Sequence, residues 1–286
     1  MSEPSVSEPK SANAFDWSAT RGDKWLAHVS GMEAMLAPVD QPLIAALRLD
    51  APSSIAEIGC GGGGTALEIL GRAPSGSRIH GFDLSPQLVE LARGRTRPGD
   101  ERIAFEVADM AKAAPDKPYQ RLVSRFGLMF FEDAAAAFVN IARWLEPGGR
   151  FAFAVWGPRS ENPWLTSVSE VVAQVVEIPK PDPQAPGPFR YAEGGALLAL
   201  LQAAGFVELD VQPWRGTLSI GGGLPPTEAA QFALAAFSSF SELLAQRGDA
   251  AFDQARSALS ARFSDHQAGG VVELDACVRI FSGAQA

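Results

Sequence analysis

Five glycines occur within six residues at positions 59–64, where the sequence reads Gly-Cys-Gly-Gly-Gly-Gly. They lie between an apolar run, residues 55–58, and a run with helical spacing that begins at Thr65. Because glycine has no side chain, backbone N–H groups in such a loop can approach a ligand closely. The N-terminus of the following helix also favours an anion, by about 0.3–1 kcal/mol. The loop therefore predicts a ligand cradle at the carboxyl ends of the strands in a parallel sheet.

Strand-like and helix-like segments alternate from residue 53 to residue 157. Start signals support the helices, such as Ser85 as an N-cap directly before Pro86. The alternation predicts a parallel sheet with helices on both faces. The predicted strands are residues 53–59, 77–83, 102–109, 121–126 and 151–157, and the predicted helices are about 65–72, from 85 onward and near 133–145, with a turn at 146–149.

The second half of the chain departs from this rhythm. We expect helices at 162–178, 193–204, 227–246 and 249–263, a proline-rich loop at 180–188, a strand pair or one bent strand at 207–220, and a final strand at 271–281. The late helices predict a cap beside the sheet. The expected organisation is a disordered tail (1–13), an N-terminal helical lid (14–50), a core (51–225) with an inserted helix and loop near 160–190, a helical cap insertion (226–266) and a final core strand (267–286).

The formal net charge of −9 bears on partners. Nucleic-acid binding needs basic patches, and an anionic membrane surface repels an acidic chain, so we expect neither partner. The two cysteines exclude a disulfide framework, and the first residues do not read as a signal peptide. No apolar run approaches the roughly 18 residues of a membrane span. We expect a soluble, cytoplasmic protein.

The glycines fit two overlapping patterns. Gly59, Gly61 and Gly64 spell G-x-G-x-x-G, which can hold a dinucleotide. Glu57, Gly59, Gly61 and Gly63 spell E-x-G-x-G-x-G, which resembles the first motif of the class I S-adenosylmethionine-dependent methyltransferases. The glycines alone do not decide between the two patterns.

Three further features favour the methyltransferase resemblance. Asp83 ends the second predicted strand, although dinucleotide enzymes share this feature. Asp109 ends the third strand in VADM, like the adenine-binding acid of the family. The segments SRFGLMFFED and RWLEPGGRFAFAVWG resemble its fourth-strand region and the turn before strand five. The resemblance covers residues 53–157 well and 187–220 weakly. Within the family, the chain resembles the ubiquinone/menaquinone C-methyltransferase-like small-molecule branch.

This resemblance implies an α/β fold, Rossmann-like and doubly wound, with a mostly parallel seven-stranded sheet whose last strand is antiparallel. It also implies S-adenosyl-L-methionine as cofactor and S-adenosyl-L-homocysteine as product. In the family pattern the glycines pass close to the methionine moiety, Asp83 binds the ribose, and Asp109 with Met110 contacts the adenine edge. The residues that the resemblance assigns to the cofactor are Glu57, Gly59, Cys60, Gly61, Asp83, Leu84, Asp109, Met110 and Arg125.

The candidates for catalysis and acceptor binding are weaker. His28 is a candidate general base, although a histidine on a helix surface is the commoner case. The three histidines do not cluster, so we expect no metal site. Aromatic residues after the fifth strand either wall the acceptor pocket or pack the cap onto the sheet. The candidate pocket residues are Trp25, Phe130, Trp156, Asn162, Trp164 and Arg190, the last of which also fits a surface salt bridge.

Three functions remain open at this point. The first is methyl transfer to a small-molecule acceptor by in-line displacement, driven by positioning and desolvation. The second is a nicotinamide-dependent oxidoreductase, which gives Asp109 no role. The third is a repurposed S-adenosylmethionine-binding protein that does not methylate, for example one that promotes a cyclisation. The sequence does not decide the acceptor atom, and it leaves a homodimer open.

Overall fold

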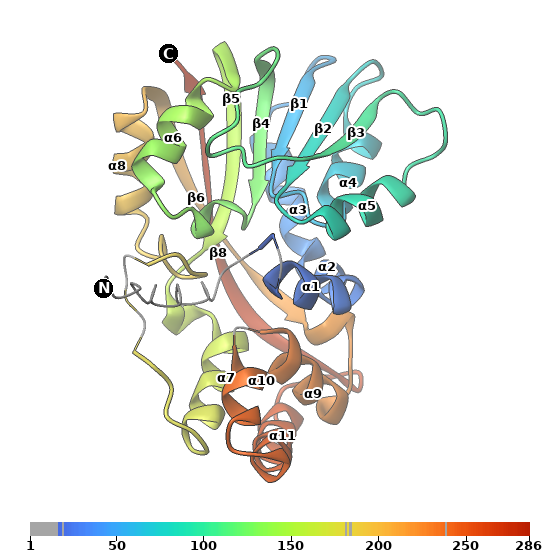
Figure 1. Ribbon diagram of the computed structural model, residues 1–286, viewed down its shortest axis with the longest axis vertical. Helices are drawn as coiled ribbons and strands as arrows, with labels where there is room; N and C mark the ends of the chain where they lie inside the picture. The colour runs from blue at the N-terminus through green and yellow to red at the C-terminus, as the bar shows by residue number, and fades with distance from the viewer. Residues whose placement is uncertain (1–16, 19, 181, 183–184, 238) are drawn as a thin grey trace, which may run out of the picture.

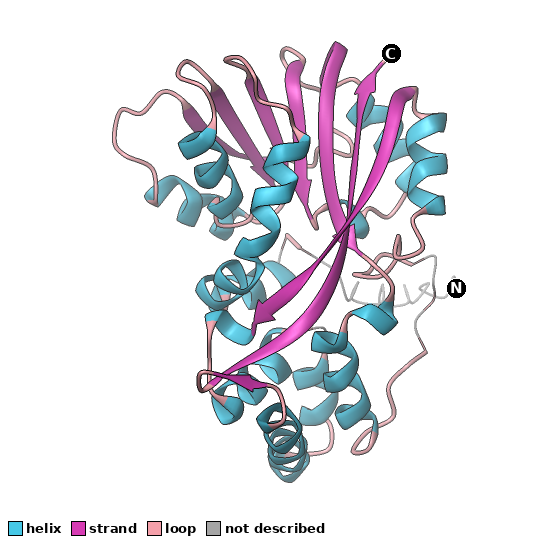
Figure 2. Cartoon of the chain, turned by 180° about the vertical axis from the view of Figure 1, so that it is seen from behind, coloured by secondary structure: helices cyan, strands magenta, loops and turns pink. Residues whose placement is uncertain are grey.

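The computed structural model describes residues 17–286 apart from 19, 181, 183–184 and 238. The predicted tail, residues 1–13, and the first three residues of the predicted lid lie outside the described part of the chain. Within the described part, an α/β core and a helical cap share one long pair of strands, which runs from one to the other in Figures 1 and 2.

The core sheet has the strand order β3-β2-β1-β4-β5-β8-β6, and the short β7 pairs with β8 outside this row. Strands β1 to β5 pair in parallel, whereas β8 is antiparallel to both β5 and β6. This arrangement confirms the predicted fold class. The strands are β1 Ser54–Ile58, β2 Arg78–Asp83, β3 Ile103–Val107, β4 Tyr119–Arg125, β5 Leu145–Trp156, β6 Phe206–Ser219, β7 Gln267–Ala268 and β8 Val271–Gln285.

The sheet changes its winding direction between β1 and β4. The chain moves outward from β1 to β3, returns to β4, and then moves outward on the other side. Because such crossovers are right-handed, the helices after β1 and β2 cover one face and those after β4 and β5 cover the other. This reversal brings the carboxyl ends of β1 and β4 side by side, where open sheets of this type bind ligands. The core helices are α4 Gly64–Arg72, α5 Pro86–Gly94, α6 Ala134–Ala142 and α8 Gly195–Ala203.

The structure follows the local signals of the sequence with a few differences. Ser85 caps α5 as predicted, because its hydroxyl accepts a hydrogen bond from the Leu88 amide at 3.3 Å. The predicted turn at 146–149 forms as an irregularity inside β5, which interrupts the pairing with β4 between residues 119 and 121. Residues 206–219 form one bent strand, and Glu208 at the bend has a φ of 52°. The single helix expected at 227–246 is divided in two, because the chain is extended at Phe237.

The cap is built on the part of β6 and β8 that continues beyond β5. Residues 278–284 of β8 pair with β5, whereas residues 273–277 pair with β6 alone. Helices α7 and α9 contact both β8 of this two-stranded ribbon and helix α11. Leu259 and Phe263 of α11 are fully buried. Helix α7, which we expected within the core insertion, therefore packs with the cap. The cap helices are α7 Pro163–Ala173, α9 Pro226–Ala236, α10 Phe240–Ala245 and α11 Asp249–Ser264, with short 3-10 turns η3 Arg159–Glu161 and η4 Ile220–Gly222.

The N-terminal helices lie between core and cap (Figure 1). Lys24 of the first helix forms an ion pair with Glu242 of α10 at 2.9 Å. Glu33 of the second pairs with Arg95 at 2.8 Å, and Arg95 also donates to the Gly62 carbonyl. These contacts fasten the N-terminal segment to both neighbours. Its elements are α1 Thr20–Ala27, α2 Val29–Leu36, η1 Ala37–Val39 and α3 Asp40–Ala46. None of the helices that the structure describes is long and apolar enough to cross a membrane.

Candidate functional site

The glycine loop connects β1 to α4 at the carboxyl edge of the sheet. Gly59, Gly61 and Gly63 have φ values of 69°, 53° and 83°, a left-handed conformation that other residues rarely adopt. At Gly63 a Cβ atom would also lie 2.8 Å from the Phe105 ring. The amides of Gly59 and Cys60 donate to the Phe82 carbonyl, which holds the loop against the end of β2. The glycines are therefore needed for both the backbone conformation and the close packing of this loop.

Two acids from neighbouring strand ends lie beside the loop. Asp83 accepts hydrogen bonds from the amides of Gly61 at 2.8 Å and Ser85 at 2.9 Å. Burial raises the pKa of Asp83, although these backbone hydrogen bonds act in the opposite direction. Asp109 accepts from the Ala111 amide and pairs with Lys112 at 2.9 Å. The Ala108 amide donates to the Asp83 carbonyl, so the two strand ends are directly connected.

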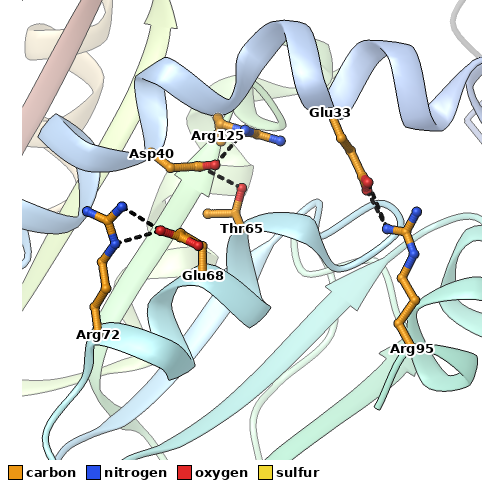
Figure 3. Close-up of polar contacts among 7 residues, drawn as sticks. All are labelled: Glu33, Asp40, Thr65, Glu68, Arg72, Arg95 and Arg125. Carbon is orange, nitrogen blue, oxygen red and sulfur yellow. Dashed lines mark hydrogen bonds and ion pairs between the residues drawn. The ribbon is translucent and has the colours of Figure 1, made fainter. Parts of the chain in front are cut away.

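A buried charged group lies on the other side of the loop (Figure 3). Arg125, at the end of β4, donates to Asp40 of α3 at 2.9 Å, and Asp40 also accepts from the Thr65 hydroxyl at 2.9 Å. The side chains of Arg125 and Asp40 are both only 9% exposed. Burial raises the pKa of Asp40, and Arg125 opposes that shift. This network joins the N-terminal segment, the sheet edge and the first turn of α4.

Glu57 lies next to this network, at the end of β1, and is 1% exposed. Its Oε2 atom has no hydrogen-bond partner among the described residues. Burial raises the pKa of Glu57 well above its ordinary value, and the nearby charge of Arg125 only partly offsets this effect. A buried carboxyl oxygen without a partner is costly, so Glu57 is suited to accept a hydrogen bond from a donor or cation of a ligand.

Apart from Asp40, the acidic and basic groups described above, together with the glycine loop, line one cavity of about 630 Å³. All nine residues that the sequence assigned to the cofactor are part of its lining, as are four of the six assigned to the acceptor pocket, Trp25, Phe130, Trp156 and Trp164. The glycine loop and the two acids form one side, and the other side is mainly aromatic and aliphatic. The structure therefore brings a polar, amide-rich region and an apolar region together in one space.

Three residues that we predicted for the site do not line the cavity. Asn162 is fully buried and binds the backbone of Pro158 and Cys277, so it anchors the chain after β5. Arg190 donates to the Phe131 carbonyl and lies over the Tyr191 ring. His28 packs edge-on against Phe232, with a centroid distance of 5.7 Å. Burial and the neighbouring Lys24 lower the pKa of His28.

Sequence reasoning missed several lining residues. Phe237, at the end of α9, lines the cavity, whereas Phe232 and Phe240 do not. Phe126 also lines it and has a φ of 68°, which is unusual for an aromatic residue. Thr65 lines the cavity as part of the Asp40 network. The described residues contain no group of three or more histidine, cysteine or acidic side chains that could hold a metal ion.

Residues 55–149 match the family model described as a methyltransferase domain. A trans-aconitate 2-methyltransferase from Methylobacterium nodulans is 36% identical over 110 residues, which cover 38% of this chain and 41% of that protein. A demethylmenaquinone methyltransferase from Deinococcus radiodurans is 31% identical over 108 residues, or 37% of this chain and 44% of that protein. The chain therefore spans less than half the length of these curated relatives.

Solved structures match most of the chain. The YcgJ protein from Bacillus subtilis superposes with a TM-score of 0.56 at 17% identity, covering 86% of this chain and 97% of that one. The [4+2]-cyclase SpnF superposes with a TM-score of 0.52 at 18% identity, covering 87% of this chain and 81% of that one. These similarities show a shared Rossmann-like fold.

Proposed function

We propose that the chain transfers a methyl group from S-adenosylmethionine to a small molecule, on the premise that residues 55–149, which match the methyltransferase-domain model, form a domain of the class I, S-adenosylmethionine-dependent kind. One observation carries the proposal. The glycine loop, both strand-end acids and a set of aromatic rings line a single cavity of about 630 Å³. A cofactor and an acceptor can therefore meet in one space.

The residues at the methionine end fit the cofactor. The unpartnered Oε2 of Glu57 suits an ammonium group such as the α-amino group of the methionine moiety. Gly59 and Gly61 present backbone without side chains along the same part of the cavity. The guanidinium of Arg125 donates a hydrogen bond to Asp40. Its charge therefore only partly offsets the effect of burial on the pKa of Glu57.

The residues at the adenosine end fit as well. The carboxylate of Asp83 is fixed by the amides of Gly61 and Ser85 and borders the cavity, so its remaining acceptor sites suit the ribose hydroxyls. Asp109 and the backbone of Met110 offer an acceptor and a donor for the adenine edge. Leu84, which is 40% exposed in this structure, gives an apolar surface for the base.

The cofactor, when bound, supplies a methyl group already activated by a sulfonium. The chain then has to hold the acceptor in line and keep water away, which are effects of positioning and desolvation. The apolar lining and the N-terminal helices, fastened to core and cap through Lys24 and Glu33, serve these purposes. His28 lies outside the cavity lining, so we assign it no part in proton transfer.

Turnover of a labelled methyl group tests the proposal. The protein is incubated with methyl-tritiated S-adenosylmethionine and fractions of a small-molecule extract, and the label is followed into new products. We expect transfer that depends on the protein. If the cofactor binds but the label never leaves it, the chain belongs with the non-methylating alternative, for which the fold shared with SpnF gives a precedent. Stabilisation by a nicotinamide cofactor and not by S-adenosylmethionine in a thermal-shift assay would favour the oxidoreductase.

Replacement of Asp83 tests the cofactor site itself. Because hydrogen bonds to a charged group contribute about 1.5–3 kcal/mol, we expect Asp83→Ala to weaken S-adenosylmethionine binding by at least about tenfold in calorimetry, with the fold retained. Asp100→Ala is the control, because Asp100 pairs with Arg102 and does not line the cavity. Equal affinities for both variants would contradict the assignment.

The expected cytoplasmic location and the homodimer that the sequence leaves open stay predictions. Light scattering of the purified chain measures the second directly, and a monomer would exclude it.

A further inference from the structure

We propose that the acceptor is an uncharged, largely apolar molecule with a flat ring system, and this inference rests on the proposed methyl-transfer function. The evidence is a set of aromatic side chains, here called the aromatic wall. They line the same cavity as the glycine loop, but they offer apolar surface where the loop offers backbone amides. The wall consists of Trp25, Phe126, Phe130, Trp156, Trp164 and Phe237.

Part of the aromatic wall is a continuous series of packed rings. Phe126 stacks on Trp156 with a centroid distance of 4.2 Å and an interplanar angle of 10°. Trp156 lies 4.5 Å from Trp164, which meets Phe237 edge-on at 5.1 Å. These four rings, from the residue after β4, from β5, from α7 and from the end of α9, thus support one another. Rings in such an array favour stacked or edge-on contact with another ring.

A second group of rings reaches the same cavity from other segments. Trp17 packs edge-on against Trp25 at 5.9 Å and against Phe130 at 4.9 Å. Trp25 and Phe130 are only half-buried, so their surfaces remain available to a ligand. The N-terminal helices and the 3-10 turn η2, Leu128–Phe130, therefore add apolar surface to the cavity.

The charges of the cavity oppose an anionic acceptor. Its described lining includes the carboxyl groups of Glu33, Glu57, Asp83, Asp109, Glu132 and Asp133 but only the cations Arg21, Lys112 and Arg125. Lys112 is paired with Asp109, and Arg125 with Asp40. The Arg21 Cζ atom lies 5.8 Å from the centroid of the Trp17 ring, and its guanidinium interacts electrostatically with Glu242. Glu33 is likewise paired, with Arg95, which does not line the cavity. A substrate with several carboxylates would therefore have to displace Asp109 from Lys112 or Asp40 from Arg125 to reach the cation of either pair.

The backbone at Phe126 supports a role for its ring. A non-glycine residue in the left-handed region costs about 1–2 kcal/mol, and such strain is often retained at ligand sites. At Phe126, with a φ of 68°, this conformation is combined with an amide hydrogen bond to the Ala154 carbonyl at 2.9 Å and with the stack on Trp156. The chain thus keeps a costly conformation that holds an aromatic ring in the cavity lining.

The family match does not include four of the six residues of the aromatic wall. That match covers residues 55–149, and Trp25, Trp156, Trp164 and Phe237 all lie outside it. The matched region contains the glycine loop and both strand-end acids, which serve the cofactor. Acceptor choice is therefore determined mainly by segments that the family model does not describe.

Binding of two contrasting probes tests the inference. The protein is saturated with S-adenosylhomocysteine, whose binding is first measured by calorimetry, and is then titrated with N-phenyl-1-naphthylamine, a neutral aromatic fluorophore, or with trans-aconitate, a tricarboxylate. We expect saturable, blue-shifted fluorescence from the naphthylamine and no heat from trans-aconitate. Phe130→Ala should weaken naphthylamine binding about tenfold, or about 1.4 kcal/mol, and leave S-adenosylhomocysteine affinity within about twofold.

Phe252→Ala is the matched control, because Phe252 of α11 is also half-buried but does not line the cavity. It should leave both affinities unchanged. Saturable binding of trans-aconitate, absence of naphthylamine binding, or equal effects of the two phenylalanine replacements would each overturn the inference. Failure of S-adenosylhomocysteine itself to bind would instead refute the proposed function, so the two failures are distinguishable.

Discussion

Replacement of Asp40 by alanine is the perturbation that most directly tests how the N-terminal segment supports the site. The substitution removes the anionic partner of Arg125, and both side chains of this pair are only 9% exposed. Loss of one partner of a buried ion pair typically costs about 3–5 kcal/mol, because the other charge stays buried. The lost hydrogen bond from Thr65 adds about 1 kcal/mol.

One neighbour reduces that cost. Glu57 is close enough to Arg125 for its pKa to respond to the guanidinium, so Arg125 keeps a second anion nearby. We therefore expect Asp40→Ala to lower the free energy of unfolding by about 3 kcal/mol, the lower end of the range. The affinity for S-adenosylmethionine should also fall, because Arg125 released toward Glu57 competes with the ammonium group of the cofactor.

Urea unfolding followed by circular dichroism measures the first effect, and calorimetry the second. Asp253→Ala is the control, because Asp253 forms an exposed pair with Arg256 and should contribute less than about 0.5 kcal/mol. The double variant Asp40→Ala/Arg125→Met should recover part of the loss, since it removes the unpaired charge as well. An effect of Asp40→Ala no larger than that of Asp253→Ala would refute the reasoning.

Two further replacements are expected to give the more stable protein of a compared pair, although each introduces a residue that would ordinarily be less favourable. Phe126→Gly should be about 1 kcal/mol more stable than Phe126→Ala in urea unfolding, because glycine accepts the φ of 68°; an alanine variant of equal or higher stability would contradict this. For Glu57, burial raises the pKa in the folded state, so wild-type stability is lost as pH rises from the unfolded pKa toward the folded one, by up to about 1.4 kcal/mol per pH unit. The Glu57→Gln variant lacks this loss, so its free energy of unfolding should exceed that of wild type at pH 7 and be similar near pH 4. It should also bind S-adenosylmethionine more weakly. A stability difference of the same size at both pH values would exclude the explanation.

The sequence could predict the sheet and the residues that gather at its carboxyl edge, because the signals for both are local. The glycine loop follows β1, Asp83 is the last residue of β2, and Asp109 follows β3. Parallel strands bring their carboxyl ends to one edge whatever the details of packing. Once the strands between residues 53 and 157 are recognised, these groups must lie near one another, which explains why all nine assigned residues line the cavity.

The Asp40–Arg125 pair and the apolar side of the cavity could not be predicted in the same way, because they depend on contacts between distant segments. Asp40 and Arg125 are 85 residues apart, and no local pattern marks Asp40 as a partner. Asn162 has a polar side chain and follows the fifth strand, which made it a candidate for the site. Its side-chain amide instead donates to the backbone carbonyl of Cys277, 115 residues later. Phe237 lines the cavity and Phe232 does not, because the chain becomes extended at the end of α9, which the helical periodicity does not reveal.

Hydrogen–deuterium exchange with and without S-adenosylhomocysteine tests most directly the claim that the sheet edge holds the cofactor. We predict slower exchange at the amides of residues 59–63 and at those of Leu84 and Met110, with unchanged exchange in α11, which contributes no residue to the cavity lining. Protection in the cap alone, or tight binding without protection of the glycine loop, would contradict the account.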